Sequence, residues 1–444
     1  MSDEYDYELI QRRLDTFRRL READDVPALM ATVHAGLSRN VGGIGHPALF
    51  EHTRVGTKRL IEEYVGELDR CLRLIAETDT PDLPLKARIE FFSGLRKVFG
   101  RSALLLSGGA TLGMYHLGVI KALYEAKLLP RIFSGSSAGS IVAAIVCTRT
   151  DEELPLMFDP ANINMEAIER RGEGTLQRRL TRLWKTGYFF DTRVLQECIR
   201  ANSGDITFLE AYNRTRRVLN ITVSSSTTFE LPRLLNYLTA PDVLIWSAVS
   251  ASCAIPGLYA PVPLMAKTRN GDIVPWNPAG TQWVDGSVEG DLPMARLAEQ
   301  FNVNHFVVSQ VNPHVIPFLQ TKPVAAGRRT LRRRLQYLVS SEIQHRLEQL
   351  FELGIFPQFV SRFVFMTRSL ISQTYTGDIT IVPSIGYTEY LKLMTNPVVV
   401  EVRANIRKAE LATWEKMSII HMHCRTERTL DSYAVRNRGK WGAS

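Results

Sequence analysis

One serine of this 444-residue chain lies in a motif whose spacing suits a nucleophile. Ser137 is the centre of the sequence Gly-Ser-Ser-Ala-Gly, with Gly135 and Gly139 two residues to either side. A short apolar approach, 129–133, precedes the motif, and an apolar, helix-compatible run, 140–146, follows it. A serine on a sharp strand-to-helix turn needs small neighbours, because its hydroxyl must project clear of the bent backbone. The same turn would also serve plain helix packing, so the motif by itself leaves two interpretations open.

A second glycine-rich turn, 107–113, follows a predicted strand at 103–106 and precedes a predicted helix at 115–126. The backbone N–H groups of such a turn can cradle a phosphate or form an oxyanion hole. The turn does not match a dinucleotide-binding G-x-G-x-x-G, since Ala110 stands at the third key position, and no Gly-Lys-Ser/Thr follows as in a P-loop. Together with the serine motif, the turn favours an oxyanion hole.

A base for Ser137 is the next requirement, because a serine is a weak nucleophile until a neighbouring group takes its proton. Asp285 ends an apolar approach and is followed by glycine, so it could accept that proton directly or orient a histidine. His305 and His314 follow in the chain order of a Ser-Asp-His hydrolase. His305, however, lies within an apolar predicted strand, His314 in a turn, and His116 behind the glycine-rich turn. We interpret all three as structural and expect a Ser–Asp dyad.

Charge and cysteine usage narrow the class of protein. The net charge of +8 suits an anionic partner. The basic residues are not interleaved with aromatic ones as in a single-strand-binding groove, so an anionic lipid surface is favoured and no nucleic acid is expected. The cysteines at 71, 147, 198, 253 and 424 have neither metal-site nor disulfide spacing. We expect buried free thiols, no metal and no cofactor.

The chain offers no clear targeting or membrane-spanning segment. Its acidic N-terminus resembles neither a signal peptide nor a transit peptide, so a secreted protein is not expected. The stretches 102–120, 132–148 and 243–266 lack charge. They are rich in glycine, serine or proline, which fits buried strand–turn–helix units better than membrane spans.

The pattern along the chain predicts three regions. Residues 1–100 show helical periodicity, with segments near 57–76 and 85–99. Residues 101–312 alternate short strands and helices, which is typical of an α/β domain with a mostly parallel sheet; further strands are predicted at 131–133, 218–224 and 305–311. The helical, charged stretch 151–212 within this domain could form a lid or a wall.

The third region, 313–444, is basic and predicted to be mainly helical. Its segment 328–350 has the pattern of a basic amphipathic helix, which fits a membrane surface or an ordinary surface helix equally well. The aromatic cluster at 351–365 slightly favours a role at an interface. Residues 400–435 are predicted to form one further helix.

The glycine-rich turn, the serine motif and the aspartate motif, in this order, resemble the patatin-like phospholipase family. The segments 101–129, 235–256 and 301–314 resemble the branch that contains plant and fungal triacylglycerol lipases, and residues 1–100 resemble the domain that precedes the patatin core there. The sequence departs from the family pattern in two places. Ala110 stands where many members carry glycine, and the acid motif ends in Ser287 rather than alanine or glycine.

The resemblance implies a three-layer α/β/α core and a catalytic dyad. Ser137 would be the nucleophile, Asp285 the base, and the amides of Gly108 and Gly109 the oxyanion hole. The motif glycines are Gly113, Gly135, Gly139 and Gly286. The implied activity is hydrolysis of triacylglycerol at a lipid droplet or the cytosolic face of a membrane.

Three alternatives stay open. One is a phospholipase or lysophospholipase that uses the same dyad. The second is a transacylase, because an acyl-enzyme can pass its acyl group to an alcohol instead of water. The third is a non-catalytic protein that recruits partners to a lipid surface.

Overall fold

A mostly parallel β-sheet lies at the centre of the protein, in a computed structural model that describes residues 4–441 except 52, 54, 82, 171–175, 227–231, 278–279, 287–291, 314, 317–341 and 343–375. The strand order is β4-β3-β2-β1-β8-β9, and β7 also pairs with β3. The strands are β1 (Arg101–Leu106), β2 (Ile132–Gly135), β3 (Val218–Ser225), β4 (Arg233–Leu235), β7 (Trp283–Asp285), β8 (Val303–Ser309) and β9 (Ile379–Ile381). β4 and β7 run antiparallel to β3, and the other described neighbours are parallel. A separate hairpin consists of β5 (Met265–Lys267) and β6 (Ile273–Pro275).

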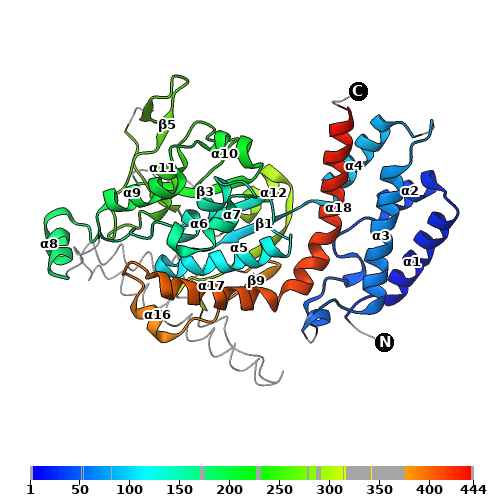
Figure 1. Ribbon diagram of the computed structural model, residues 1–444, viewed down its shortest axis with the longest axis horizontal. Coiled ribbons are helices and arrows are strands. Elements are labelled where there is room, and N and C mark those ends of the chain that lie inside the picture. Colours follow the sequence, from blue (N-terminus) through cyan, green and yellow to red (C-terminus); the bar gives the residue numbers. More distant parts are fainter. Residues whose placement is uncertain are drawn as a thin grey trace.

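Helices cover both faces of this sheet, because its central strands are apolar on both faces. In β1, Leu104 and Leu106 join the larger core, to which α5 (Tyr115–Glu125) and α6 (Ala138–Cys147) also contribute. Ala103 and Leu105 point to the opposite face, where α12 (Met294–Phe301) supplies Leu297 and Phe301. The α/β/α layering predicted from the sequence is therefore confirmed (Figure 1).

The other α-helices that the structure describes in the α/β body lie around this core. They are α7 (Leu154–Met157), α8 (Leu176–Thr186), α9 (Thr192–Ser203), α10 (Phe208–Thr215), α11 (Ile245–Cys253), α16 (Tyr387–Leu391) and α17 (Val399–Trp414). α9 packs on α11 and α6, and α17 packs on α5. The crossing of α17 and α5 needs a glycine, since a Cβ atom at Gly118 would lie only 2.1 Å from the carbonyl oxygen of Ile406.

The N-terminal helices form a separate bundle beside the sheet (Figure 1). They are α1 (Tyr7–Glu22), α2 (Val26–Gly36), α3 (Arg59–Glu77) and α4 (Leu85–Phe99), and the long C-terminal helix α18 (Met417–Trp441) packs on α3 and α4. α1 and α3 each present an apolar stripe to the other, with Phe17 stacked on Tyr64 at 5.9 Å between ring centroids. The helical character predicted for 57–76 and 85–99 is confirmed by α3 and α4.

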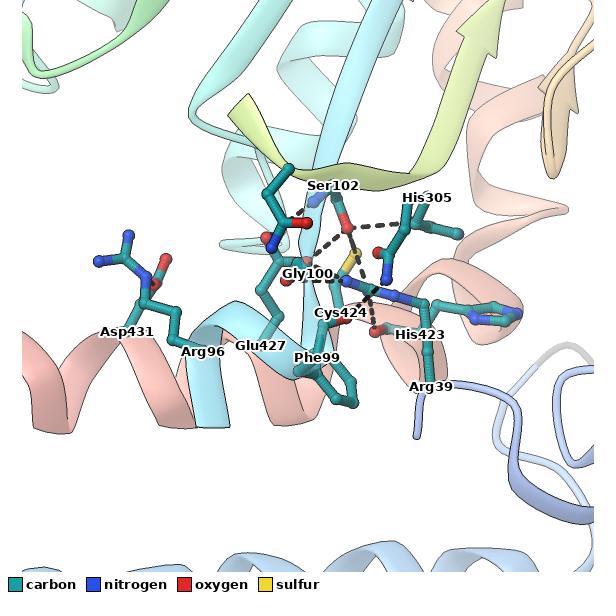
Figure 2. Close-up of polar contacts among 12 residues, drawn as sticks. Arg39, Arg96, Phe99, Gly100, Ser102, His305, His423, Cys424, Glu427 and Asp431 are labelled. Atoms are coloured by element: carbon teal, nitrogen blue, oxygen red, sulfur yellow. Dashed lines mark hydrogen bonds and ion pairs between the residues drawn. The ribbon is translucent and has the colours of Figure 1, made fainter. Parts of the chain in front are cut away.

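A buried polar joint connects the bundle to the sheet at the amino end of β1 (Figure 2). Arg39 donates to the Ser102 hydroxyl at 3.2 Å, to the carbonyl oxygens of Gly100 and His423, and to the carboxylate of Glu427 at 3.1 Å. Glu427 in turn accepts from the backbone N–H and the hydroxyl of Ser102, at 2.9 and 2.5 Å. The N-terminal bundle, the sheet and α18 therefore share one hydrogen-bond network, and the carboxyl edge of the sheet faces away from it.

Two sequence predictions for the C-terminal region need correction or extension. The single helix predicted over 400–435 is wrong, because the chain turns at Glu415 and Lys416 between α17 and α18. α17 buries its apolar side against α5 and α18 buries its own against α3 and α4, so the two helices serve different cores. In addition, β9 belongs to the sheet although it lies beyond the range 101–312 assigned to the α/β domain.

Some predictions fall outside the described residues. These are His314, Ser287, most of the amphipathic segment 328–350 and the aromatic cluster 351–365. In the described part of the chain, no helix combines the length and the apolar character needed to cross a membrane. The uncharged stretch 243–266 instead contains α11 and the start of β5, as the sequence indicated.

Candidate active site

Ser137 lies at a strained turn between β2 and α6. Its backbone angles are φ 49° and ψ −126°, a region that residues with a Cβ atom rarely adopt. Hydrogen bonds hold the turn on both sides: Ser136 N–H donates to the carbonyl of Leu106 at 3.1 Å, and Ser137 N–H donates to the hydroxyl of Ser252, also at 3.1 Å. A strained, well-anchored serine between a strand and a helix has the geometry of a nucleophile elbow.

The glycines of the serine motif are required by close approach of backbone segments. A Cβ atom at Gly139 would lie 2.3 Å from the carbonyl oxygen of Leu106, and one at Gly135 would lie 2.6 Å from the carbonyl oxygen of Gly139. At Gly113 the obstacle would be the Cβ atom of Ala138, 2.6 Å away. Helix α6 therefore starts pressed against the ends of β1 and the glycine-rich turn.

The glycine-rich turn passes directly beside the serine. A Cβ atom built on Gly108 would lie 3.3 Å from the Cβ atom of Ser137 and 3.3 Å from the side-chain oxygen of Asn312. Gly109 packs against Val311, where an added Cβ atom would meet the carbonyl oxygen at 2.8 Å. Ala110 adopts φ 50°, a left-handed conformation that explains why glycine would suit its position.

The pairing of β7 places Asp285 on the same side of β3 as the serine turn. Gly135, the last residue of β2, pairs with Ile221 of β3. Asp285 pairs with Val223, whose other partner is Arg233 of β4. A strand residue has one paired neighbour on each side, and β4 occupies one side of Val223. β7 therefore pairs with β3 on the same side as β2, beyond the point where β2 ends.

The register of this pairing brings the serine and the aspartate to one level of the sheet. Asp285 is aligned two residues beyond the end of β2, and Ser137 follows Gly135 by two residues. Both side chains are buried, with exposed fractions of 7% for Ser137 and 1% for Asp285. A Cβ atom at Gly286 would lie 2.9 Å from the backbone of Val223, so this motif glycine permits the close approach of β7.

The C-terminal end of α11 connects the two residues. Ser252 accepts from Ser137 N–H, and Ala254 accepts from Asp285 N–H at 3.2 Å. Between them, burial raises the pKa of the Cys253 thiol, and the nearby charge of Asp285 adds to this effect, whereas hydrogen bonding with Ser140 and Ser137 opposes it. The sequence interpretation missed these three positions at the C-terminal end of α11. Their signal is the run of small residues in a helix without charge.

The histidines occupy other positions. His116 is fully buried behind the glycine-rich turn, where its Nε2 lies 2.9 Å from the carbonyl oxygen of Ser107 and its Nδ1 lies 2.7 Å from the hydroxyl of Ser309. Burial lowers the pKa of His116 to about 4. The ring is therefore neutral at pH 7 and ties the turn to the end of β8.

His305 lies at the opposite end of the sheet from the serine, within the polar joint at the amino end of β1 (Figure 2). Its Nδ1 is 3.0 Å from the hydroxyl of Ser102, and its ring stacks on His423 at 4.7 Å between centroids. The Ser102 hydroxyl donates its hydrogen bond to the Glu427 carboxylate. In the bond between Ser102 and His305, the N–H at Nδ1 of His305 is therefore the donor and the Ser102 oxygen is the acceptor. Burial lowers the pKa of His305, and His423 and Arg39 add to the effect.

The fold and these motifs define an α/β protein of the patatin-like class. The family model described as patatin-like phospholipase matches residues 104–298, and a model described as a domain of unknown function (DUF3336) matches residues 1–97. The chain belongs to the patatin-like phospholipase family, as the sequence motifs predicted.

Curated relatives match over nearly the whole chain. Triacylglycerol lipase SDP1L of Arabidopsis thaliana is 41% identical over 97% of this chain and 54% of its own length. Triacylglycerol lipase 4 of Saccharomyces cerevisiae is 40% identical over 96% and 48%, and triacylglycerol lipase ptl3 of Schizosaccharomyces pombe is 36% identical over 96% and 88%. The chain spans about half the length of the first two relatives. Among solved structures, VipD from Legionella pneumophila shares 16% identity with a TM-score of 0.36, covering 73% of this chain and 68% of that one.

Proposed function

We propose that this protein is a serine acyl-ester hydrolase with Ser137 as nucleophile and Asp285 as base. The observation that carries the proposal is the register of β2 and β7 on β3, which aligns both residues at the carboxyl edge of the sheet. The strained turn at Ser137 and the close approach of Gly108 to this serine support it. No histidine among the described residues shares this position, so the proposal is a dyad.

The proposed reaction has two steps. In the first, Asp285 accepts the hydroxyl proton as Oγ of Ser137 attacks the ester carbonyl, and the alcohol leaves with that proton. The amides of Gly108 and Gly109 donate to the oxyanion; the loss of one such donor typically raises the barrier by about 3 kcal/mol. In the second step, Asp285 takes a proton from the water that attacks the acyl-enzyme. The fatty acid leaves, and Asp285 returns the proton to Oγ of Ser137. The residues supply this chemistry without a metal or a cofactor.

The substrate that we propose is triacylglycerol. Three relatives at 36–41% identity are named triacylglycerol lipases, and this name supports the proposal for the present chain. A phospholipase, lysophospholipase or transacylase activity on the same dyad is the second candidate, because the matching family model is described as patatin-like phospholipase. The proposed location is peripheral, at a lipid droplet or the cytosolic face of a membrane, with a lipid and no nucleic acid as partner.

The proposal is tested with triolein emulsions and phosphatidylcholine vesicles. We expect the purified chain to release fatty acid from triolein, and Ser137→Ala and Asp285→Asn to release at least a thousandfold less. Ser136→Ala is the matched control, because Ser136 is a buried neighbour in the same motif with no proposed role. Equal release by wild type and Ser137→Ala would contradict the mechanism. Release from phosphatidylcholine alone would contradict the triacylglycerol assignment.

A further inference from the structure

Helix α8 carries an exposed apolar pair together with a basic face. Trp184 is 92% exposed and Leu180, one turn earlier, is 51% exposed. The helix contains three arginines and one lysine and no acidic residue (Leu176–Thr186). Exposed tryptophan and leucine on one side of a basic helix are typical of helices that lie in the headgroup region of a lipid layer.

The other side of α8 is anchored to the protein. Arg179 pairs with Glu169 and lies over the ring of Phe190, 5.4 Å from its centroid, while Arg182 pairs with Asp191 at 3.2 Å. These contacts fix the inner face of the helix and leave Leu180 and Trp184 pointing outward. The sequence of α8 itself carries four basic residues and no acidic one, so its own charge is positive.

The helix is linked by a short path to the candidate active site. Phe190 N–H donates to the carbonyl of Leu258 at 2.9 Å, within the loop that follows α11. The same loop begins at Ala254, which accepts from the backbone N–H of Asp285. α8 thus stands at the carboxyl-edge end of the molecule, opposite the N-terminal bundle (Figure 1).

A second exposed apolar group lies at the same end. On α16, Tyr387 is 93% exposed and Leu391 is 86% exposed. The residue after this helix, Lys392, accepts from the hydroxyl of Thr111 in the glycine-rich turn at 3.2 Å. Asn396 connects the region after α16 with the segment that leads to α8. In that segment, the N–H of Ile168 donates to the Asn396 side chain at 2.9 Å. Exposed apolar side chains therefore lie on two helices, α8 and α16, that are connected to elements of the candidate site.

We propose that α8 docks this protein on a phospholipid-covered surface that carries anionic headgroups. Leu180 and Trp184 insert at the level of the acyl chains, and the basic residues contact the headgroups. Charge selects this occupant, because a basic, acid-free helix is attracted to an anionic layer. The inference rests on the proposed function only in that docking would turn the site of Ser137 toward lipid esters.

Binding is measured separately from catalysis, by flotation of the full chain with vesicles of phosphatidylcholine alone or mixed with phosphatidic acid. We expect wild type and Ser137→Ala to float with the mixed vesicles. The double variant Leu180→Ser/Trp184→Ser should bind them about tenfold more weakly or worse, since two exposed apolar side chains are lost. The matched control is Leu411→Ser/Trp414→Ser, which removes a leucine and a tryptophan, 53% and 46% exposed, from α17; it should bind as wild type does.

Three results would overturn the docking proposal: equal flotation of the α8 variant and wild type, equal flotation with neutral and anionic vesicles, or loss of a dimer in the α8 variant by light scattering. The last would identify a second copy of the chain as the occupant.

Hydrolysis of water-soluble p-nitrophenyl butyrate should be unchanged in the α8 variant, which keeps the two proposals separate. If Ser137→Ala hydrolysed that ester as well as wild type, the proposed dyad would fail while flotation still decided the role of α8.

Discussion

The backbone N–H of Ser137 donates to the hydroxyl of Ser252 at 3.1 Å. This bond joins the strained turn after β2 to the last turn of α11. The residues that follow Ser252 lie beside the aspartate: Cys253 is close to the charge of Asp285, and Ala254 accepts from the Asp285 N–H. Removal of the hydroxyl would leave a buried N–H without its partner and would release the turn from α11. The bond therefore couples the position of the proposed nucleophile to that of the proposed base.

We predict that Ser252→Ala lowers kcat by tenfold to a hundredfold, roughly, because a small displacement of the nucleophile is costly. The free energy of unfolding should also fall, by about 1–3 kcal/mol, for the unsatisfied N–H. Ester hydrolysis and urea denaturation measure the two effects. Ser250→Ala is the control: its hydroxyl bonds within α11, to the carbonyl of Trp246 at 2.7 Å. A comparable loss of kcat in Ser250→Ala would show that Ser252 has no special positioning role.

A second prediction separates the dyad from a triad. His305→Ala should retain kcat within about twofold, because His305 lies at the amino end of β8, the end of the sheet opposite Ser137. Its free energy of unfolding should nevertheless fall by about 2 kcal/mol, through loss of the Ser102 contact and of the stacking on His423. If a folded His305→Ala protein lost activity as fully as Ser137→Ala, a histidine would have to be restored to the mechanism.

The local motifs were predictable from the sequence, whereas the placement of the aspartate was not. The turns after β1 and β2 are set by neighbouring residues, namely small residues after an apolar strand and before an apolar helix, and Ser137 is found where this pattern places it. Asp285 belongs to a three-residue strand, and its position depends on antiparallel pairing with β3, some sixty residues earlier in the chain. Spacing along the chain carries no information about that register.

The C-terminal half also contains elements whose bounds the sequence pattern does not predict. The break between α17 and α18 has no glycine or proline to mark it, because it arises from burial against two different partners. β9, Ile-Thr-Ile, is too short to show a strand pattern and is defined by its pairing with β8. Tertiary contacts decide such elements, and a single sequence does not display them.

A third prediction concerns pH and His116. Burial lowers the pKa of His116 to about 4 in the folded protein, below its ordinary value of 6.5. The unfolded chain therefore binds a proton more readily, and the free energy of unfolding falls as the pH drops from about 6.5 toward 4. Between pH 7 and pH 5 this residue should contribute a loss of about 2 kcal/mol.

The measurement is the urea midpoint of wild type and His116→Gln at several pH values. The variant should lose less stability between pH 7 and pH 5, although His423, whose pKa is also lowered to about 4, continues to contribute. His34→Gln is a suitable control, since His34 is exposed on α2. Identical pH dependence in wild type and His116→Gln would contradict the assignment of a buried, neutral imidazole.

A fourth prediction tests the joint between the N-terminal bundle and the sheet. The side chains of Arg39 and Glu427 are only 8% and 15% exposed. Arg39→Met should lower the free energy of unfolding by about 3–5 kcal/mol, because it leaves the Glu427 carboxylate buried without its cation. The same substitution in a Glu427→Gln background should cost clearly less, since no charge is then left uncompensated.

The partly exposed pair of Arg18 and Glu63 in the N-terminal bundle provides the comparison, with side chains 38% and 33% exposed. Arg18→Met should destabilise the protein less than Arg39→Met, because water reaches this pair and screens it. Urea denaturation gives the stabilities, and limited proteolysis reports whether the bundle separates from the sheet. Because Arg39 contacts Ser102 and the carbonyl of Gly100 at the start of β1, the joint should loosen before the carboxyl edge does. Arg39→Met should therefore expose cleavage sites near residue 100 while hydrolysis of a short, soluble ester persists. If protection from cleavage and ester hydrolysis were lost together, the joint and the candidate active site would unfold as one unit.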